Sequence, residues 1–286
     1  MTPGTATPPP PNAEPLADAA GTATVQSIAF VNRADDSRPA IVQFPDSASR
    51  AVFVGLRPAV TAGDATAPAA DLTLLVVPAR AADAEGLAPE ELAWVEAAGP
   101  VQAIAVHGAA LAWAAGRAAI RVEPARLDAV RAAVVEFCFH ERELRAIEAE
   151  VAAGWPEVEA DAPLAFEFRD RDADRRRALG ERFRRTVSLR ARLARLAPHL
   201  DRPPLHPPTL ASQVGERLRE RSRMAERAGF LTGQIEVQER VYDLCGQRSS
   251  DWALSRKSTT LEWAIVVLIA IETVLILVDL LATRGT

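Results

Sequence analysis

The sequence predicts an α+β protein made of a ferredoxin-like mixed α/β domain, a long antiparallel helical hairpin of coiled-coil character and one C-terminal transmembrane helix. Short apolar runs between turn residues predict the first part, apolar positions at helical spacing the second, and a long apolar stretch near the end the third. The expected boundaries are 1–24 for a disordered N-terminus, 25–168 for the α/β domain, 169–258 for a basic hairpin, 259–282 for the membrane helix and 283–286 for a short tail.

The α/β domain is expected from the order of its short apolar runs. Strands are predicted at 25–31, 40–44, 51–56, 72–77, 101–106, 109–113, 118–122 and 164–168, with one helix at 89–98 and a longer helix that starts at Pro124. Pro124 suits the first turn of a helix, and Gly154 with Pro156 is expected to end that helix. From residue 72 the order approximates βαββαβ, the split ferredoxin-like arrangement.

After Phe168 the sequence changes to charged helix formers that carry two apolar stripes. One stripe is formed by Leu179, Phe183, Val187, Leu193, Leu196 and Leu200, and the other by Leu210, Val214, Leu218, Ala225, Ala228, Leu231, Ile235, Tyr242 and Cys245. A helix cannot continue through the proline-rich segment 203–208. Two helices joined by a proline turn are therefore expected, with seams that bury each other or those of a second copy.

The apolar stretch from Leu261 to Ala282 predicts a single membrane anchor. Its 22 residues span about 33 Å as a helix, enough for a hydrocarbon core of about 30 Å. A buried core helix is the alternative, but such helices rarely hold eight apolar residues in a row, as 264–271 does. The short tail makes this a tail-anchored pattern.

Charge and targeting signals give the expected orientation. Arg248, Arg256 and Lys257 precede the anchor, whereas Arg284 is the one basic residue after it, so the N-terminal bulk is expected in the cytoplasm and the anchor in the inner membrane if the chain is bacterial. The proline-rich N-terminus shows no secretory signal. Cys138 and Cys245 are too few for a disulfide framework or a metal cluster, and are expected to be packing residues.

The net charge of −5 conceals an electrical division of the chain. Residues 1–165 hold 11 Arg and 22 acidic residues, for a net −11, and residues 166–260 hold 21 basic and 13 acidic residues, for a net +8. A basic region beside an anchor favours anionic lipid or nucleic acid as a partner. The plain alternative is a solvated helical surface.

Arginines cluster at the start of the basic region, where Arg175, Arg176, Arg177, Arg184 and Arg185 form a possible face for an anionic partner. Guanidinium groups bind phosphates well, which favours RNA, the ribosome or anionic lipid. Acidic residues lie among these arginines, however, and favour ion pairs within the helices instead. Few aromatic residues lie among them, which disfavours a stacking site for single-stranded nucleic acid.

Glu272 stands inside the apolar stretch, where a charged carboxylate costs about 2.5 to 3.5 kcal/mol on insertion scales. Asp279 lies seven residues further on nearly the same face, and the small Thr273 is adjacent. Three interpretations remain open. The acid contacts another helix in a homo-oligomer, an apolar enough helix tolerates it, or it handles ions or protons.

The order of features in the last hundred residues carries a family resemblance. It rests on Thr186 to Leu196, Leu200 to Pro203, the run from Ser255 that ends in Leu261, Glu262 and Trp263, and the closing segment Ile269 to Glu272. This region resembles the required-for-meiotic-nuclear-division family, which ends in coiled helices, a Leu-Glu-Trp motif and a membrane segment with a glutamate. The resemblance implies a membrane-anchored oligomer, and mitochondrial relatives support translation by ribosomes at the inner membrane.

No catalytic, cofactor or metal site is predicted. The histidines, at 107, 140, 199 and 206, are scattered, and His140, the nearest to a constellation, is expected to be a surface or interface residue. The sequence holds no glycine-rich phosphate loop and no nucleophile elbow.

The predicted function is therefore a membrane-anchored, homo-oligomeric scaffold or interaction protein without catalysis, cofactor or small-molecule substrate. The alternatives are a membrane-tethered RNA- or ribosome-binding factor and a hydrolase or transferase with an unrecognised site.

Overall fold

The structure, a computed structural model, describes residues 22–32, 38–44, 47–59, 70–80, 86–201 and 207–284, with side chains to residue 276. The chain forms two compact units, each built from two separate segments. The sheet unit consists of Met1–Ala146 and Arg195–Ala228, and the helical unit of Ile147–Ala194 and Gly229–Thr286. The predicted α+β class is confirmed. The expected boundaries at residues 168 and 258 follow composition rather than packing, and stay predictions.

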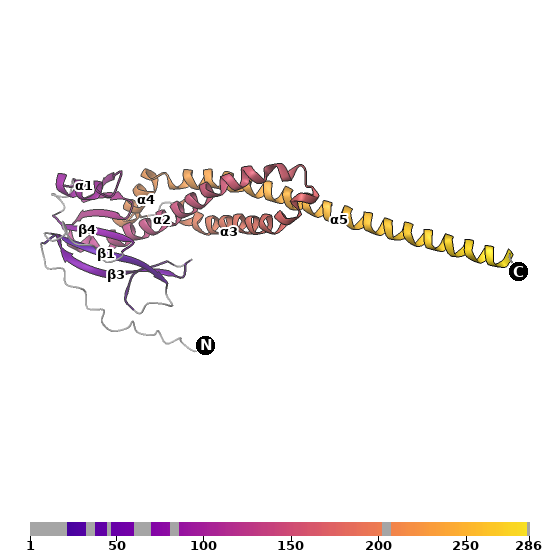
Figure 1. The fold of residues 1–286 in the computed structure, drawn as a ribbon. Coiled ribbons are helices and arrows are strands. Elements are labelled where there is room, and N and C mark those ends of the chain that lie inside the picture. Colours follow the sequence, from indigo (N-terminus) through magenta and orange to yellow (C-terminus); the bar gives the residue numbers. More distant parts are fainter. Residues whose placement is uncertain are drawn as a thin grey trace, which may run out of the picture. The chain divides into compact units, whose positions relative to one another are not determined.

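The sheet unit is built on one seven-stranded mixed sheet (Figure 1). Its strands are β1 (Thr24–Asn32), β2 (Ala40–Gln43), β3 (Ser49–Pro58), β4 (Leu72–Pro78), β5 (Gln102–Val106), β6 (Ala109–Ala114) and β7 (Arg117–Val122). They lie in the order β2-β3-β1-β4-β7-β6-β5. Only the central β4–β7 pair is parallel, and the other five pairs are antiparallel.

Tight turns fix the register of the last three strands. His107 and Gly108 join β5 to β6 with positive φ angles of 41° and 81°, so that Val106 lies opposite Ala109. Two consecutive positive φ angles are typical of the two-residue turns that match the twist of a hairpin. Gly116, with φ of 80°, has the same role between β6 and β7.

Strand β6 is buried along its whole length because helices cover both faces of the sheet. Ala112 and Ala114 pack with Val95 of helix α1 (Pro89–Glu96) on one face. On the other face Trp113 meets Phe137 of helix α2 (Pro124–Asp161) edge to face, with ring centroids 5.0 Å apart. Successive residues of β6 therefore pack alternately into two apolar cores, one on each face of the sheet.

Helix α2 runs further than the sequence predicts. Gly154 and Pro156 were expected to end it, but it continues to Asp161 with Pro156 inside the helix. A proline in a helix interior costs about 3 kcal/mol. Two interactions of the following residues act against this cost: Val158 is buried in the helical unit, and Asp161 accepts hydrogen bonds from Arg175 and Arg182.

The strand predicted at 164–168 is wrong. Residues Ala162–Ala165 form a 3-10 turn, and Asp170–Arg175 form another. Leu164 and Ala165 are neighbours in sequence yet both are buried, packed with Leu179, Tyr242 and Cys245. In the described residues the order from Leu72 is therefore βαβββα, without the last strand of the ferredoxin-like arrangement.

Three helical segments make up the helical unit, from the end of α2, from α3 (Arg176–Leu200), which runs antiparallel to α2, and from α5 (Met224–Arg284), which runs parallel to α2. Their buried positions lie three or four residues apart, with one step of seven residues in α3. These are Ile147, Val151, Gly154, Val158 and Asp161 of α2, Leu179, Thr186, Leu189 and Leu193 of α3, and Leu231, Ile235, Gln238, Tyr242, Cys245 and Ser249 of α5. This spacing keeps one side of each helix facing the shared core.

The predicted hairpin differs in its second arm, which is divided. Helix α4 (Leu210–Arg221) ends at Ser222, and Arg223 with φ of 52° separates it from α5. Helix α4 belongs to the sheet unit, where it lies against β5 and the Ser222 hydroxyl donates to Gln102 Oε1 at 2.8 Å. Most of the proline-rich turn, 202–206, lies outside the described residues, as does the N-terminus to residue 21.

Truncation of Leu74 tests the sheet core. Leu74 of β4 is fully buried, whereas Leu56 of β3 in the same sheet is 43% exposed. We expect Leu74→Ala to lower the free energy of unfolding by about 2 to 5 kcal/mol, and Leu56→Ala to lower it by less than about 1 kcal/mol. Urea denaturation followed by tryptophan fluorescence measures both, and equal losses would contradict this core.

Candidate functional site

Two carboxylates that are almost completely buried, one in each unit, each pair with two arginines. Asp161, which is fully buried at the end of α2, accepts hydrogen bonds from Arg175 and Arg182 in the helical unit. In the sheet unit Glu141 is 1% exposed and accepts from Arg145 at 2.7 Å and Arg227 at 2.8 Å. A carboxylate is tolerated in a core when charged donors satisfy it, which these pairs of guanidinium groups do.

Two titratable side chains lie beside Asp161 in the helical unit. Burial, with a further contribution from the Asp161 charge, raises the pKa of the Cys245 thiol to about 11 and that of Tyr242 to about 12. The Cys245 thiol also donates to the Asp161 carbonyl oxygen at 3.6 Å. Burial raises the pKa of Cys138 as well. Both thiols are therefore protonated at neutral pH. Because a cysteine nucleophile needs the thiolate, this agrees with the predicted role of both cysteines as packing residues.

The arginines predicted to face an anionic partner do not form one free basic surface. Arg175 binds Asp161, Arg177 pairs with Glu181 at 3.1 Å, and Arg185 pairs with Glu157 at 2.6 Å. The two remaining members, Arg176 and Arg184, are exposed.

The same pattern continues along α3, where Arg192 pairs with Glu150 at 2.6 Å and Arg190 with Glu236 at 3.5 Å. These pairs join α3 to α2 and to α5. Most of these arginines thus form ion pairs with acidic residues inside the helical unit.

The Leu-Glu-Trp motif and Glu272 lie on the last part of α5. Leu261 and Trp263 are each 66% exposed, and Glu262 accepts from the Ser258 hydroxyl at 3.3 Å. Glu272 is also exposed. These residues therefore lie along one helix, and no other described element of the helical unit packs against them.

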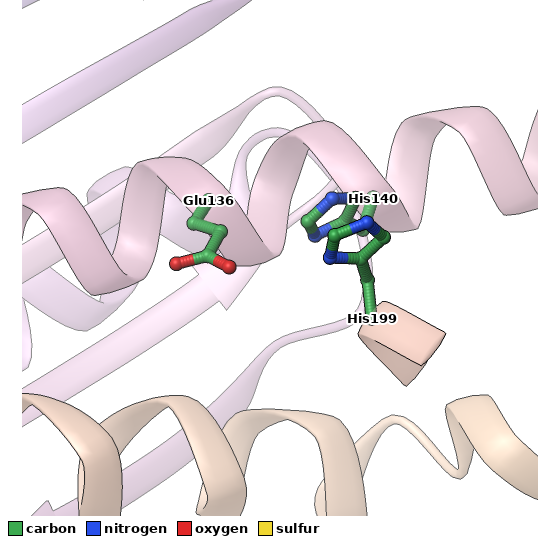
Figure 2. A group of neighbouring side chains, drawn as sticks. All are labelled: Glu136, His140 and His199. Atoms are coloured by element: carbon green, nitrogen blue, oxygen red, sulfur yellow. The ribbon is translucent and has the colours of Figure 1, made fainter. Parts of the chain in front are cut away.

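A cluster that the sequence analysis missed lies in the sheet unit. Glu136 and His140 are one turn apart on α2, and His199 comes from the last turn of α3. Figure 2 shows the Glu136 carboxylate directed to the same side of α2 as the two imidazole rings. One potential ligand atom from each residue lies within 4.8 Å of the others.

His140 corrects the prediction of a surface or interface residue, because it is only 6% exposed. Its ring stacks on that of His199, with centroids 4.5 Å apart and planes inclined by 14°. Phe44 and Phe139 contact it edge-on, at 6.0 and 5.4 Å. The Glu136-x-x-x-His140 spacing was the signal available in the sequence, since residues four apart share a helix face.

Comparison with known proteins adds no relative, since no protein-family model, no curated protein and no solved structure matches the chain. The family resemblance of the C-terminal region accordingly stays a prediction.

Removal of the Asp161 carboxylate tests the charged core of the helical unit. We expect Asp161→Ala to lower the free energy of unfolding by about 2 to 3 kcal/mol, less than a fully buried pair would because water still reaches part of Arg175. Glu181→Gln is the matched control, since its partner Arg177 is 91% exposed, and should change stability by less than about 0.5 kcal/mol. Urea denaturation in detergent measures both, and an unchanged midpoint for Asp161→Ala would refute this role.

Proposed function

We propose that the protein is a membrane-anchored interaction protein, in which α5 spans the bilayer and the sheet and helical units work at its surface. One observation carries this proposal. Every large apolar side chain of α5 from Leu261 to Ile276 is between 51% and 66% exposed. By length and composition α5 is a helix that can cross a membrane, and its most apolar 18-residue window has no part buried in the protein.

Lipid is the medium that best fits this helix. Apolar surface left in water costs about 25 cal/mol per Å², and soluble proteins rarely expose contiguous apolar patches beyond a few hundred Å². Here the exposure goes all the way round the helix, since it includes the consecutive residues Ile265 to Ile269. A single protein partner covers one side of a helix, whereas acyl chains cover all sides.

The flanking charges support a cytoplasmic location for the bulk of the chain. Arg248, Arg256 and Lys257 lie before the apolar segment, and basic residues close to a membrane helix favour the cytoplasmic side. Arg256 also pairs with Asp170 at 3.5 Å, and its Cζ lies 5.5 Å from the centroid of the Trp252 ring.

The resemblance to the required-for-meiotic-nuclear-division family supports the same proposal, because it implies a membrane-anchored oligomer. An RNA, ribosome or anionic lipid partner has less support. The ion pairs of Arg175, Arg177 and Arg185 would have to break, or be shared, to bind phosphates.

A charge placed in the apolar segment tests the anchor. We expect Leu268→Arg to weaken membrane insertion by about 3 kcal/mol, on the order of 100-fold, because an arginine replaces an apolar side chain near the helix centre. Leu254→Arg is the matched control, since Leu254 is 65% exposed against 66% for Leu268 but lies before the segment. Alkaline extraction of membranes followed by immunoblotting measures the released fraction.

Release of Leu268→Arg, and of a chain lacking 261–286, with retention of Leu254→Arg is the predicted pattern. If the chain lacking 261–286 stays with the membrane as an integral protein, α5 is not the anchor.

Replacement of Glu272 tests the oligomeric part of the proposal. A carboxyl group surrounded by lipid is stabilised by a hydrogen-bonding partner on a neighbouring helix. We therefore expect Glu272→Leu to shift the protein in mild detergent to smaller species, as measured by light scattering. Glu262→Leu, a change of the same kind at the start of the segment, is the control, and identical mass distributions for wild type and Glu272→Leu would refute helix association through this acid.

A further inference from the structure

We propose that Glu136, His140 and His199 form a binding site for a divalent transition-metal ion, represented here by Zn²⁺. The three side chains offer two imidazole nitrogens and one carboxylate oxygen from two different helices (Figure 2). This site is independent of the proposed membrane anchor, because all three residues belong to the sheet unit.

The donor set selects the class of ion. Imidazole nitrogen suits zinc and its neighbours in the first transition series, while calcium and magnesium prefer oxygen ligands alone. Two histidines with one glutamate is a known zinc ligand set, with a fourth position left for water or a small anion. A thiolate is not part of the set.

The packing around the three side chains favours a metal site over a chance approach of these residues. His140 is buried and held between Phe44, Phe139 and the His199 ring, so its position is fixed by packing. Glu136 lies one turn away on the same helix, which already sets the distance between two of the three ligands. Only the third ligand has to be brought by the fold, and the last turn of α3 brings it.

Binding requires a small rearrangement. A tetrahedral zinc ion holds neighbouring ligand atoms about 3.3 Å apart, so atoms up to 4.8 Å apart must approach. A metal lies in the plane of each imidazole that binds it, and the stacked rings are inclined by only 14°. One ring therefore has to turn, and the partly exposed His199 has more freedom to do so than the buried His140.

The alternative is a stacked histidine pair with a nearby carboxylate and no metal affinity. The metal-free protein has the same contacts under either interpretation. They differ in whether Zn²⁺ binds with a stoichiometry of one per chain and in which residues it needs.

Calorimetric titration of the full-length protein with ZnCl₂ separates the two. The protein is purified in mild detergent without a histidine tag and treated with a chelator before titration. We expect one saturable site per chain, weakened at least about 100-fold in Glu136→Gln and in His199→Gln, since even outer-shell changes cost 10- to 100-fold in metal affinity. Both variants keep the size of the side chain, and circular dichroism checks their fold.

His107→Asn is the matched control. His107 is exposed in the β5–β6 turn with a positive φ angle, which asparagine also adopts readily. Its affinity for Zn²⁺ should equal that of the wild type.

A second readout does not depend on affinity. Bound Zn²⁺ should raise the melting temperature of the wild type and of His107→Asn and leave Glu136→Gln unchanged, because an ion that binds only the folded state stabilises it. Absence of saturable binding to the wild type, or an unchanged affinity in either ligand variant, would overturn the three-ligand site.

Discussion

Helix α5 is one continuous helix with two different surroundings, a protein core along its first half and exposed apolar side chains along its second half. The rest of the structure depends on this division. From Leu231 to Ser249 one side of the helix is buried against α2 and α3 in the helical unit. From Leu254 to Ile276 the large apolar side chains are between 51% and 66% exposed. A helix satisfies its backbone hydrogen bonds internally and so can pass from one environment to the other without a break. In the proposed membrane-anchored state, the end of burial near Ser249 would set how far the helical unit lies from the bilayer.

Arginine provides the second organising element. The chain uses 32 Arg and one Lys, and the planar guanidinium forms the directed hydrogen bonds that a buried carboxylate needs. Glu141 and Asp161 are each held by two arginines, one arrangement in each unit. Much of the positive charge that gives residues 166–260 their net sign thus forms ion pairs within the protein.

The sequence predicted the elements whose pattern is local and failed where distant contacts decide. The strands up to Val122 and helix α1 follow periodicity and length, and the structure has them close to their predicted bounds, whereas the predicted membrane helix is part of the longer continuous helix α5. The alternation at 164–168 suggested a strand because periodicity does not show that Leu164 and Ala165 pack on the same core. Pro156 suggested a helix end because the pairing of the buried Asp161 with Arg175 and Arg182 is not visible locally. His140 and His199 are 59 positions apart, and only the fold brings them together.

The most direct test of the account places single reporters along α5 in lipid vesicles. Cysteines introduced one at a time from 250 to 276 would carry spin labels, with the buried Cys138 and Cys245 as a quiet background. Accessibility to oxygen, which concentrates in the hydrocarbon, should rise on average from about residue 261 towards the middle of the segment, while accessibility to a water-soluble nickel complex falls. Low accessibility to both reagents along the whole segment would instead mean burial against protein, and high nickel accessibility throughout would mean that the helix lies in water.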